Sequence, residues 1–551
     1  MNHLRRCCGA LLFSIAFTAV ACADVKMPAI FGDHMVLQRD RALPIWGWAS
    51  PGESITVTAG AATASTATGP DGKWSVKLNS LPLSSDPIIV TVAGTNTVTI
   101  SDVLVGDVWI CAGQSNMGFP LNGVDDAAAV LKDATDDQLR LFTVTPALSF
   151  DVKDDCEGHW ERCTPNNAGV FSAVGYFFGR GLRSHLKIPV GLVHSSLGGS
   201  SAQAWTSHGG LEKHPELHDM LAAFDRDQPK LRAMNQTYDT VTVPKWKEDD
   251  QAWRRDVMPA YQIELKKWSA AVAAAQAAGQ PLPPKPLPSA THPALPAAPN
   301  RMAPTLLYNA MAAPLIPFAI KGVAWYQGEN NTANPKLYRA EFPAMIQDWR
   351  NLWGQGDFPF LFVQIANNRN APPIQTNPGK WAATREAQLM ALSEPNTAMV
   401  VTTDVGDPDN VHYHNKLPVG ERLALGARHL AYGENIAYSG PLFDRMAVTA
   451  SGIRITFTQA GSGLMVGIPP HGPTAGPAPP QTPLKDFEIA GADHHFVPAD
   501  ARIDGDAVVV SSTQVPDPVA VRYGWADNPQ GNLYNRDGLP ASPFRTDDWD
   551  K

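Results

Sequence analysis

Apolar strand-like segments alternate with helical patterns through the middle of this 551-residue chain. The strand-like segments are residues 108–111, 188–194, 320–325, 359–365 and 398–403. Helical patterns occupy residues 171–182, 336–353 and 381–392. Such alternation requires crossover connections, so it predicts an α/β fold with a doubly wound parallel sheet. Ligand sites in such sheets gather at the carboxyl ends of the strands, and the residues that follow each strand are therefore the candidates for function.

Strand-rich segments flank this α/β region, and one insertion interrupts it. Residues 24–105 and 445–551 read as short strands and turns, which predicts an all-β module at each end, of sandwich or jelly-roll type. The α/β domain then consists of two parts, 106–205 and 305–444. Between them, residues 206–304 combine a helical stripe of aromatic residues with a proline-rich connection. We expect the stripe to serve ordinary packing, with sugar stacking as the alternative.

The first 23 residues have the pattern of a secretory signal peptide. Arg5 and Arg6 precede an apolar stretch, residues 10–20, and an A-x-A cleavage pattern follows. The sequence therefore predicts an exported protein, periplasmic or secreted, that begins at Asp24. Two alternatives are a buried N-terminal helix and a lipid anchor on Cys22. No later segment reaches the roughly 18 apolar residues of a membrane span, so we expect no integral membrane segment in the mature chain.

Composition excludes several classes of protein. Hydrophobic residues make up 44% and charged residues 18%, which is too apolar for a disordered chain. The formal net charge of −9, or −11 without the two leader arginines, disfavours nucleic-acid partners. No cysteine pair has zinc-ligand spacing, while Cys156 and Cys163 are close enough in sequence to form a disulfide. Cys111 lies in an apolar strand, where a buried thiol is expected.

Two of the strand ends carry small residues. The first is Gly113-Gln114-Ser115-Asn116-Met117, where a serine on a tight strand-to-helix turn exposes its hydroxyl beside its own backbone N–H. A turn serine with a purely structural role is the alternative. The second is residues 197–200, where Gly198 and Gly199 would let backbone N–H groups approach a ligand closely.

Two further strand ends carry polar and charged residues. Residues 325–330 include Gln327 and Glu329, and amide groups there can donate to a developing oxyanion. Residues 404–416 contain Asp409 and His412 in a D-x-x-H arrangement, which can place a carboxylate on an imidazole within one loop. An acidic surface loop or a metal site is the alternative for that segment.

Together these segments resemble the SGNH/GDSL hydrolase superfamily, and more closely the sialate O-acetylesterase-like carbohydrate esterases. The resemblance extends over nearly the whole chain after residue 23 and rests on five stretches: GDVWICAGQSNM (106–117), PVGLVHSSLGGSSAQAW (189–205), LLYNAMAAPLIPFAIKGVAWYQGENN (306–331), DVGDPDNVHYHNKLPVGERLALGA (404–427) and VRYGWADNPQGNLYNRDGLPASPF (521–544). It implies an SGNH-type sheet and a serine carboxylic-ester hydrolase that removes acetyl groups and needs no metal or organic cofactor.

The resemblance also assigns catalytic roles. Ser115 matches the nucleophile and His412 the general base. Asp409 fits the acid by spacing, but many relatives carry the acid two residues before the histidine, where this chain has Asn410. Asp404 and Asp407 therefore remain rival candidates.

The oxyanion hole would comprise the N–H groups of Ser115 and Gly199, with Gly198 as the alternate, and the Gln327 amide, at a position where other SGNH enzymes have asparagine. The expected substrate-binding residues are Gln114, Asn116, Trp205, Tyr326, Glu329 and Arg385.

The expected partner is an O-acetylated oligo- or polysaccharide. A negatively charged protein repels an anionic sugar, which favours neutral acetylated hemicellulose, xyloglucan or xylan, over sialic acid. Sialic acid usually requires an arginine for its carboxylate, which Arg369 or Arg385 would supply. A non-catalytic carbohydrate-binding protein and a serine peptidase are the competing interpretations.

Overall fold

The computed structural model describes residues 24–281, 283–284, 286–294, 296–368, 379–470, 472 and 474–549. The expected leader, with Cys22, and Arg369 lie outside the described residues. Within the part of the chain that is described, no helix is both long enough and apolar enough to cross a membrane.

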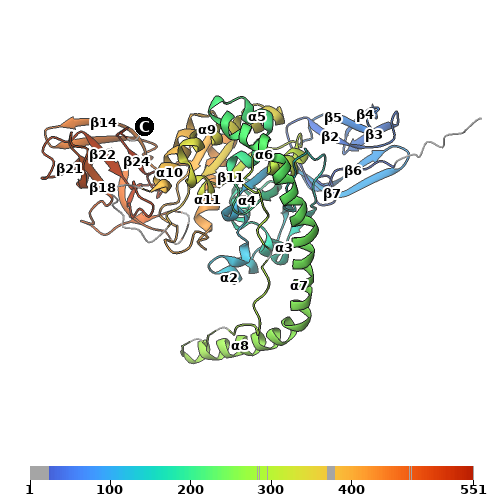
Figure 1. Ribbon diagram of the computed structural model, residues 1–551, viewed down its shortest axis with the longest axis horizontal. Coiled ribbons are helices and arrows are strands. Elements are labelled where there is room, and N and C mark those ends of the chain that lie inside the picture. Colours follow the sequence, from blue (N-terminus) through green and yellow to red (C-terminus); the bar gives the residue numbers. More distant parts are fainter. Residues whose placement is uncertain are drawn as a thin grey trace, which may run out of the picture.

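A large sheet with mostly parallel strands forms the centre of the molecule (Figure 1). Its main path runs in the order β13-β12-β11-β7-β10-β8-β9. The strands are β7 (Thr97–Gly113), β8 (Asp136–Thr143), β9 (Trp160–Cys163), β10 (Val190–Ser196), β11 (Gly322–Tyr326), β12 (Phe360–Val363) and β13 (Thr397–Val400). All neighbours are parallel except β8 and β9. This confirms the predicted α/β class, with β10 and β8 on one side of β7 and β11 to β13 on the other.

The N-terminal strands do not form a separate module, because the long strand β7 joins them to the central sheet. Its first half pairs with β1 (Val36–Gln38) and β6 (Ser84–Ala93). Strand β6 pairs in turn with β3 (Ser54–Ala59), and β3 pairs with β4 (Ala62–Ala67). The expected boundary between residues 105 and 106 therefore falls inside one continuous strand. Only β2 (Leu43–Trp48) and β5 (Lys73–Leu78) form a sheet of their own.

Amphipathic helices cover the central sheet. They are α4 (Ala173–Leu186), α9 (Pro335–Trp353), α10 (Lys380–Met390) and α11 (Leu417–Tyr432), while the short helices α2 (Ala127–Lys132) and α3 (Pro165–Val170) pack against each other. Helix α9 shows how sequence sets such bounds: the Asn334 side chain accepts a hydrogen bond from the Leu337 N–H, Pro335 occupies the first turn, and Gly354 ends the helix with a φ of 63°.

Residues 206–304 contain an arm of helices (Figure 1). The helices are α5 (His208–Glu212), α6 (His218–Thr237), α7 (Val243–Asp256) and α8 (Met258–Ala278). The indole N–H groups of Trp246, Trp253 and Trp268 each donate to a backbone carbonyl in residues 283–293, at 2.7–2.9 Å. The aromatic stripe therefore holds the proline-rich connection against the helices, as the packing interpretation expected.

The C-terminal strands form three small antiparallel sheets around their own apolar core. The strands are β14 (Leu442–Thr449), β15 (Gly452–Thr458), β16 (Leu464–Ile468), β17 (Gly476–Pro477), β18 (Phe487–Ala490), β19 (Phe496–Pro498), β20 (Asp500–Asp504), β21 (Ala507–Ser511), β22 (Ala520–Tyr523), β23 (Leu533–Asn535) and β24 (Phe544–Arg545). The presence of separate antiparallel sheets beside the α/β sheet agrees with the prediction.

The three cysteines after residue 23 are all free thiols. Cys163 is buried and donates to the Ala134 carbonyl at 3.1 Å. The disulfide that the spacing of Cys156 and Cys163 allowed is therefore not formed in the structure. Burial raises the pKa of Cys111 and of both other thiols to about 12.

Candidate active site

The central strand β7 and both its neighbours end at the same level of the sheet. Gly113, the last residue of β7, pairs with Ser196 of β10 and with Tyr326 of β11. The Leu197 N–H donates to the Gly113 carbonyl at 3.1 Å, and the Gln114 N–H donates to the Tyr326 carbonyl at 2.9 Å. A Cβ on Gly113 would lie 2.1 Å from that tyrosine carbonyl oxygen, so only glycine fits. Three loops consequently leave the sheet side by side.

Ser115 begins the four-residue helix α1 (Ser115–Gly118) at this edge, and a fourth loop brings His412 to it. The Nε2 atom of His412 lies 2.8 Å from Ser115 Oγ, although 297 positions separate the two residues. Ser115 is half-buried and His412 is exposed. The His412 N–H donates to Asn410 Oδ1 at 3.0 Å, which fixes the loop locally. The two residues have the geometry of a nucleophile and its base.

None of the three candidate carboxylates is hydrogen-bonded to the His412 imidazole. The Asp404 side chain is buried and paired with the Arg422 guanidinium at 2.7 and 2.8 Å. Asp407 accepts from the Asp409 N–H at 2.9 Å, and the Asp409 side chain is exposed. In the described ranges, no group of three or more His, Cys, Asp or Glu side chains is arranged to hold a metal ion.

A buried polar cluster, defined here as Asn116, Glu329 and Lys416, lies beneath the serine and the histidine. Asn116 Nδ2 donates to Glu329 Oε1 at 2.5 Å and to the Val411 carbonyl at 3.0 Å. Asn116 Oδ1 accepts from Lys416 Nζ at 2.6 Å. The cluster therefore connects the residue after Ser115 to the residue before His412, and it joins three loops.

Burial shifts the pKa values of the charged members of this cluster. It raises the pKa of Glu329 and lowers that of Lys416 well below its usual range, against the attraction between the two charges. The ammonium lies 3.5 Å from the centroid of the Tyr413 ring. The pKa of His412 is lowered as well, first by partial burial and then by the charge of Lys416. Both effects favour a neutral imidazole, the form that accepts a proton.

The glycine loop after β10 lies against the serine. A Cβ on Gly198 would lie 3.5 Å from Ser115 Cβ, and Gly199 has a φ of 69°. The Arg301 Nε–H donates to the Gly199 carbonyl at 3.1 Å. Among the described residues, the N–H groups of Ser115 and Gly199 have no hydrogen-bond partner, so both are available to an oxyanion.

Gln327 does not point a free amide toward that oxyanion position. It is fully buried, and its NH₂ group donates to the Ser200 carbonyl at 3.1 Å and to Asn331 Oδ1 at 2.6 Å. Its Oε1 accepts from the Tyr338 hydroxyl at 3.1 Å. In the structure, the Gln327 amide therefore stabilises the end of the glycine loop through the Ser200 carbonyl.

Several residues expected to bind substrate lie in the protein interior instead. Gln114 and Asn116 are only 3% and 1% exposed, and Trp205, Tyr326 and Arg385 are fully buried. Glu329 is committed to the polar cluster, and one of its carboxylate oxygens is buried without a partner.

The interior positions have specific partners. Trp205 packs edge-on against Trp325, and the Tyr326 hydroxyl bonds the Tyr413 hydroxyl at 2.9 Å. Arg385 donates four hydrogen bonds to backbone carbonyls, two of them in the C-terminal residues 526–527, and burial lowers its pKa to about 9. These contacts correct the expectation that Trp205, Tyr326 and Arg385 face a ligand.

Sequence reasoning missed two cations near the site. Lys416 follows the histidine motif, but nothing in its sequence environment indicates burial. Arg301 lies at the end of the insertion, and it lines a cavity of about 510 Å³ together with Gly198, Tyr238 and Lys247. This cavity lies between the insertion and the glycine loop, and Gly198, which lines it, packs against Ser115.

Comparison with known proteins agrees with this geometry. Residues 105–234 and 304–428 match the family model described as carbohydrate esterase, sialic acid-specific acetylesterase. These two segments carry Ser115, the glycine loop and His412. The unmatched residues between them contain most of the helical arm.

Relatives extend the match over almost the whole chain. The sialate O-acetylesterase of Rattus norvegicus is 30% identical over 94% of this chain and 94% of its own length. The human sialate O-acetylesterase is 29% identical over 94% of this chain and 92% of its own. The crystal structure of a carbohydrate acetylesterase from Xanthomonas citri is 36% identical, with a TM-score of 0.75, and covers 96% of this chain and all of that chain. The chain is therefore an acetylesterase of the sialic acid-specific acetylesterase family of carbohydrate esterases.

Proposed function

We propose that this carbohydrate esterase removes acetyl groups from O-acetylated glycans through a covalent acetyl-serine on Ser115. The observation that supports this mechanism is the 2.8 Å contact between Ser115 Oγ and His412 Nε2 beside a loop with free N–H groups. A serine hydroxyl is a weak nucleophile until a neighbouring base removes its proton. The lowered pKa of His412 keeps that base neutral.

The steps follow from this arrangement. Ser115 Oγ attacks the acetyl carbonyl carbon while His412 Nε2 takes the hydroxyl proton, which gives a tetrahedral oxyanion. The N–H groups of Ser115 and Gly199 donate to that oxygen. The intermediate collapses as His412 returns the proton to the departing sugar oxygen, so the sugar leaves as an alcohol. Water then attacks the acetyl-serine by the same route and releases acetate.

We propose that the base is oriented by its loop and by the polar cluster, without a carboxylate on Nδ1. The Asn116 amide holds the Val411 carbonyl, and Asn410 holds the His412 N–H. Gln327 contributes indirectly, because it fixes the Ser200 carbonyl next to the oxyanion glycine.

The glycan part of the substrate is proposed to enter the 510 Å³ cavity beside Gly198. Its wall combines the Tyr238 ring with polar groups, including Arg301, and this mixture suits the apolar face and the hydroxyl groups of a sugar. We favour an acetylated hemicellulose, xyloglucan or xylan, because the chain carries a net charge of −9.

A second candidate is O-acetylated sialic acid. Arg301 and Lys247 both line the cavity, and neither forms an ion pair with a described carboxylate, so they are available to a sugar carboxylate. The names of the mammalian relatives agree with this candidate.

We expect Ser115→Ala and His412→Ala each to lower kcat for a small acetyl ester by a factor on the order of 10⁴ to 10⁶, because members of such a pair act as a unit. The measurement is turnover of 4-nitrophenyl acetate by the full chain, with circular dichroism to verify the fold. Ser196→Ala is the matched control, since this serine contacts His194 at 2.7 Å. Retention of a tenth of the wild-type rate would remove that residue from the mechanism.

Asp409→Asn should change kcat by less than tenfold, because its carboxylate makes no hydrogen bond to His412. Asp404→Asn should instead lower the melting temperature, because it breaks a buried ion pair with Arg422. Steady-state kinetics and thermal denaturation of Asp404→Asn, Asp407→Asn and Asp409→Asn separate these effects. A loss above 10³ in kcat for Asp409→Asn, with an unchanged melting temperature, would identify Asp409 as the triad acid.

Lys416→Gln tests the electrostatic role of the polar cluster. Glutamine can still donate to Asn116 Oδ1 but carries no charge, so the pKa of His412 should rise toward its ordinary value. A general base must be neutral, so the acidic limb of the kcat/KM–pH profile should move to higher pH. An acidic limb that stays in place, in a variant that keeps its fold, would show that Lys416 does not influence the base.

The substrate preference predicts that acetate is released from acetylated xyloglucan or xylan at least ten times faster than from 9-O-acetyl sialic acid, at equal acetyl concentration. Acetate is quantified enzymatically, with Ser115→Ala as the blank. Lys247→Gln serves as the diagnostic variant, since Lys247 lines the cavity and its charge should matter only for an anionic sugar. A tenfold preference for the sialic acid substrate, lost in this variant, would favour the second candidate.

A further inference from the structure

The two-stranded sheet β2–β5 carries a row of ring side chains on one face. Along β2, Pro44, Trp46 and Trp48 are partly exposed, and they alternate with the buried residues Leu43 and Ile45. Side chains two positions apart in a strand point to the same side, so the three rings share one face with a repeat of about 6.6 Å. Three rings in a row form a platform rather than an isolated aromatic patch.

Polar side chains lie directly opposite these rings on β5. Lys77, Ser75 and Lys73 pair in register with Pro44, Trp46 and Trp48 respectively. All three are exposed, and they alternate with buried residues of β5. Apolar rings on one strand and hydrogen-bonding groups on its partner thus form one surface.

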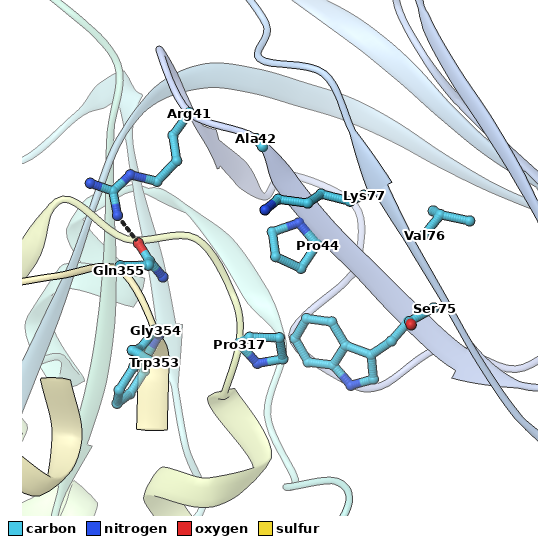
Figure 2. Close-up of a pocket in the computed structure, with 11 residues that line it drawn as sticks. Arg41, Ala42, Pro44, Ser75, Val76, Lys77, Pro317, Trp353, Gly354 and Gln355 are labelled. Carbon is cyan, nitrogen blue, oxygen red and sulfur yellow. Dashed lines mark hydrogen bonds between the residues drawn. The ribbon is translucent and has the colours of Figure 1, made fainter. Parts of the chain in front are cut away.

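This surface forms one wall of two adjoining hollows. The first hollow has a volume of about 720 Å³ and lies between β2–β5 and two other segments, the one that contains Pro317 and the end of α9 at Trp353 (Figure 2). The second has about 390 Å³ and extends along the same strands past Trp48. Both hollows share Trp46, Ser75 and Pro317, so together they form one elongated groove.

Several polar groups in the groove have no partner among the described residues. The indole N–H groups of Trp46 and Trp48 have none, and the buried Trp74 Nε1 is also unpaired. Lys77 forms no ion pair with a described carboxylate. Lys73 forms an ion pair with Asp154, with 2.6 Å between Nζ and Oδ1, across the second hollow. The groove therefore offers donors to hydroxyl groups along its length.

The groove and Ser115 lie at opposite ends of the parallel strands of the central sheet. Pro317 precedes β11 and Trp353 ends the helix before β12, so both are near the points where parallel strands begin. Ser115 follows the point where β7 ends. Five residues of a strand span about 16 Å, so the groove and Ser115 are separated by about the length of one strand.

We propose that this groove is a second, non-catalytic binding site for a polysaccharide chain, a proposal that rests on the proposed glycan esterase function. The apolar faces of successive sugar rings pack on Trp46 and Trp48, and hydroxyl groups bond the indole N–H groups, Ser75 and Lys77. The site holds a polymer on the enzyme while its acetyl groups reach Ser115. Tethering of this kind raises the effective substrate concentration and lowers KM for the polymer only.

The test combines binding and kinetics with the full chain. Calorimetric titration of Ser115→Ala with de-esterified xyloglucan and de-esterified glucuronoxylan measures the groove without turnover. We expect binding to at least one of the two, weakened tenfold or more by Trp46→Ala. In the active enzyme, Trp46→Ala should raise KM for the acetylated polymer several-fold. It should leave turnover of 4-nitrophenyl acetate within twofold.

Two further variants make the result decisive. Ser75→Glu places a larger side chain in both hollows without removing a packed atom, and it should reproduce the loss if Trp46→Ala fails to fold. Trp549→Ala is the matched control, because the ring of this tryptophan stacks on the His494 ring, with 3.7 Å between the ring centroids, in the C-terminal part of the chain outside the groove. Unchanged polymer binding in a folded groove variant, or no binding of either polymer by the parent, would overturn the proposal. If the groove binds the polymer but the active enzyme releases no acetate from the acetylated polymer, the result would instead refute the proposed glycan esterase function alone.

Discussion

The catalytic edge depends on the close approach of three strand ends around Gly113. This residue pairs on both sides, with Ser196 and with Tyr326, and its missing side chain lets the tyrosine carbonyl approach the backbone. Because parallel strands in register end together, the serine turn and the glycine loop leave the sheet as neighbours. A shift of register between β7 and β10 would separate Ser115 from Gly198.

The histidine reaches this edge by a different means. Its loop follows β13, three strands away from β7, so sheet register alone does not place it. The Asn116 cluster supplies the connection, because one amide binds Lys416, Glu329 and the Val411 carbonyl at once. Burying an ammonium and a carboxylate is unfavourable unless both find partners, so removing any member leaves the others unsatisfied. In the structure, the contacts that hold the histidine loop come from this polar network, and none of the three candidate carboxylates is hydrogen-bonded to the imidazole.

Some of this was predictable from the sequence. The alternation of strands and helices predicted the α/β class, and the strand-end motifs and their family resemblance pointed to Ser115, Gly199 and His412. The sequence signals failed where the environment is set by distant segments. Trp205 follows the glycine loop and Arg385 is an arginine that could bind a carboxylate, so both looked like ligand-binding residues. In the structure, both are covered by residues more than 100 positions away in the sequence. The composition changes at residue 105, which predicts a boundary there, although β7 continues across it as one strand.

The place of the insertion explains how chemistry and recognition can be separated in this chain. Residues 206–304 leave the sheet after β10, and the Thr305 N–H donates to the Gln203 carbonyl at 3.0 Å, so both ends of the insertion lie on the segment that follows the glycine loop. An insertion at that point adds walls to the site without entering the sheet. Its long helices are held to the proline-rich return by indole N–H groups that bind backbone carbonyls, a contact that does not depend on the side chains of the return segment. Tyr238 and Lys247 therefore set the shape and charge of the cavity from the insertion, while the contact between Ser115 and His412 is made outside it.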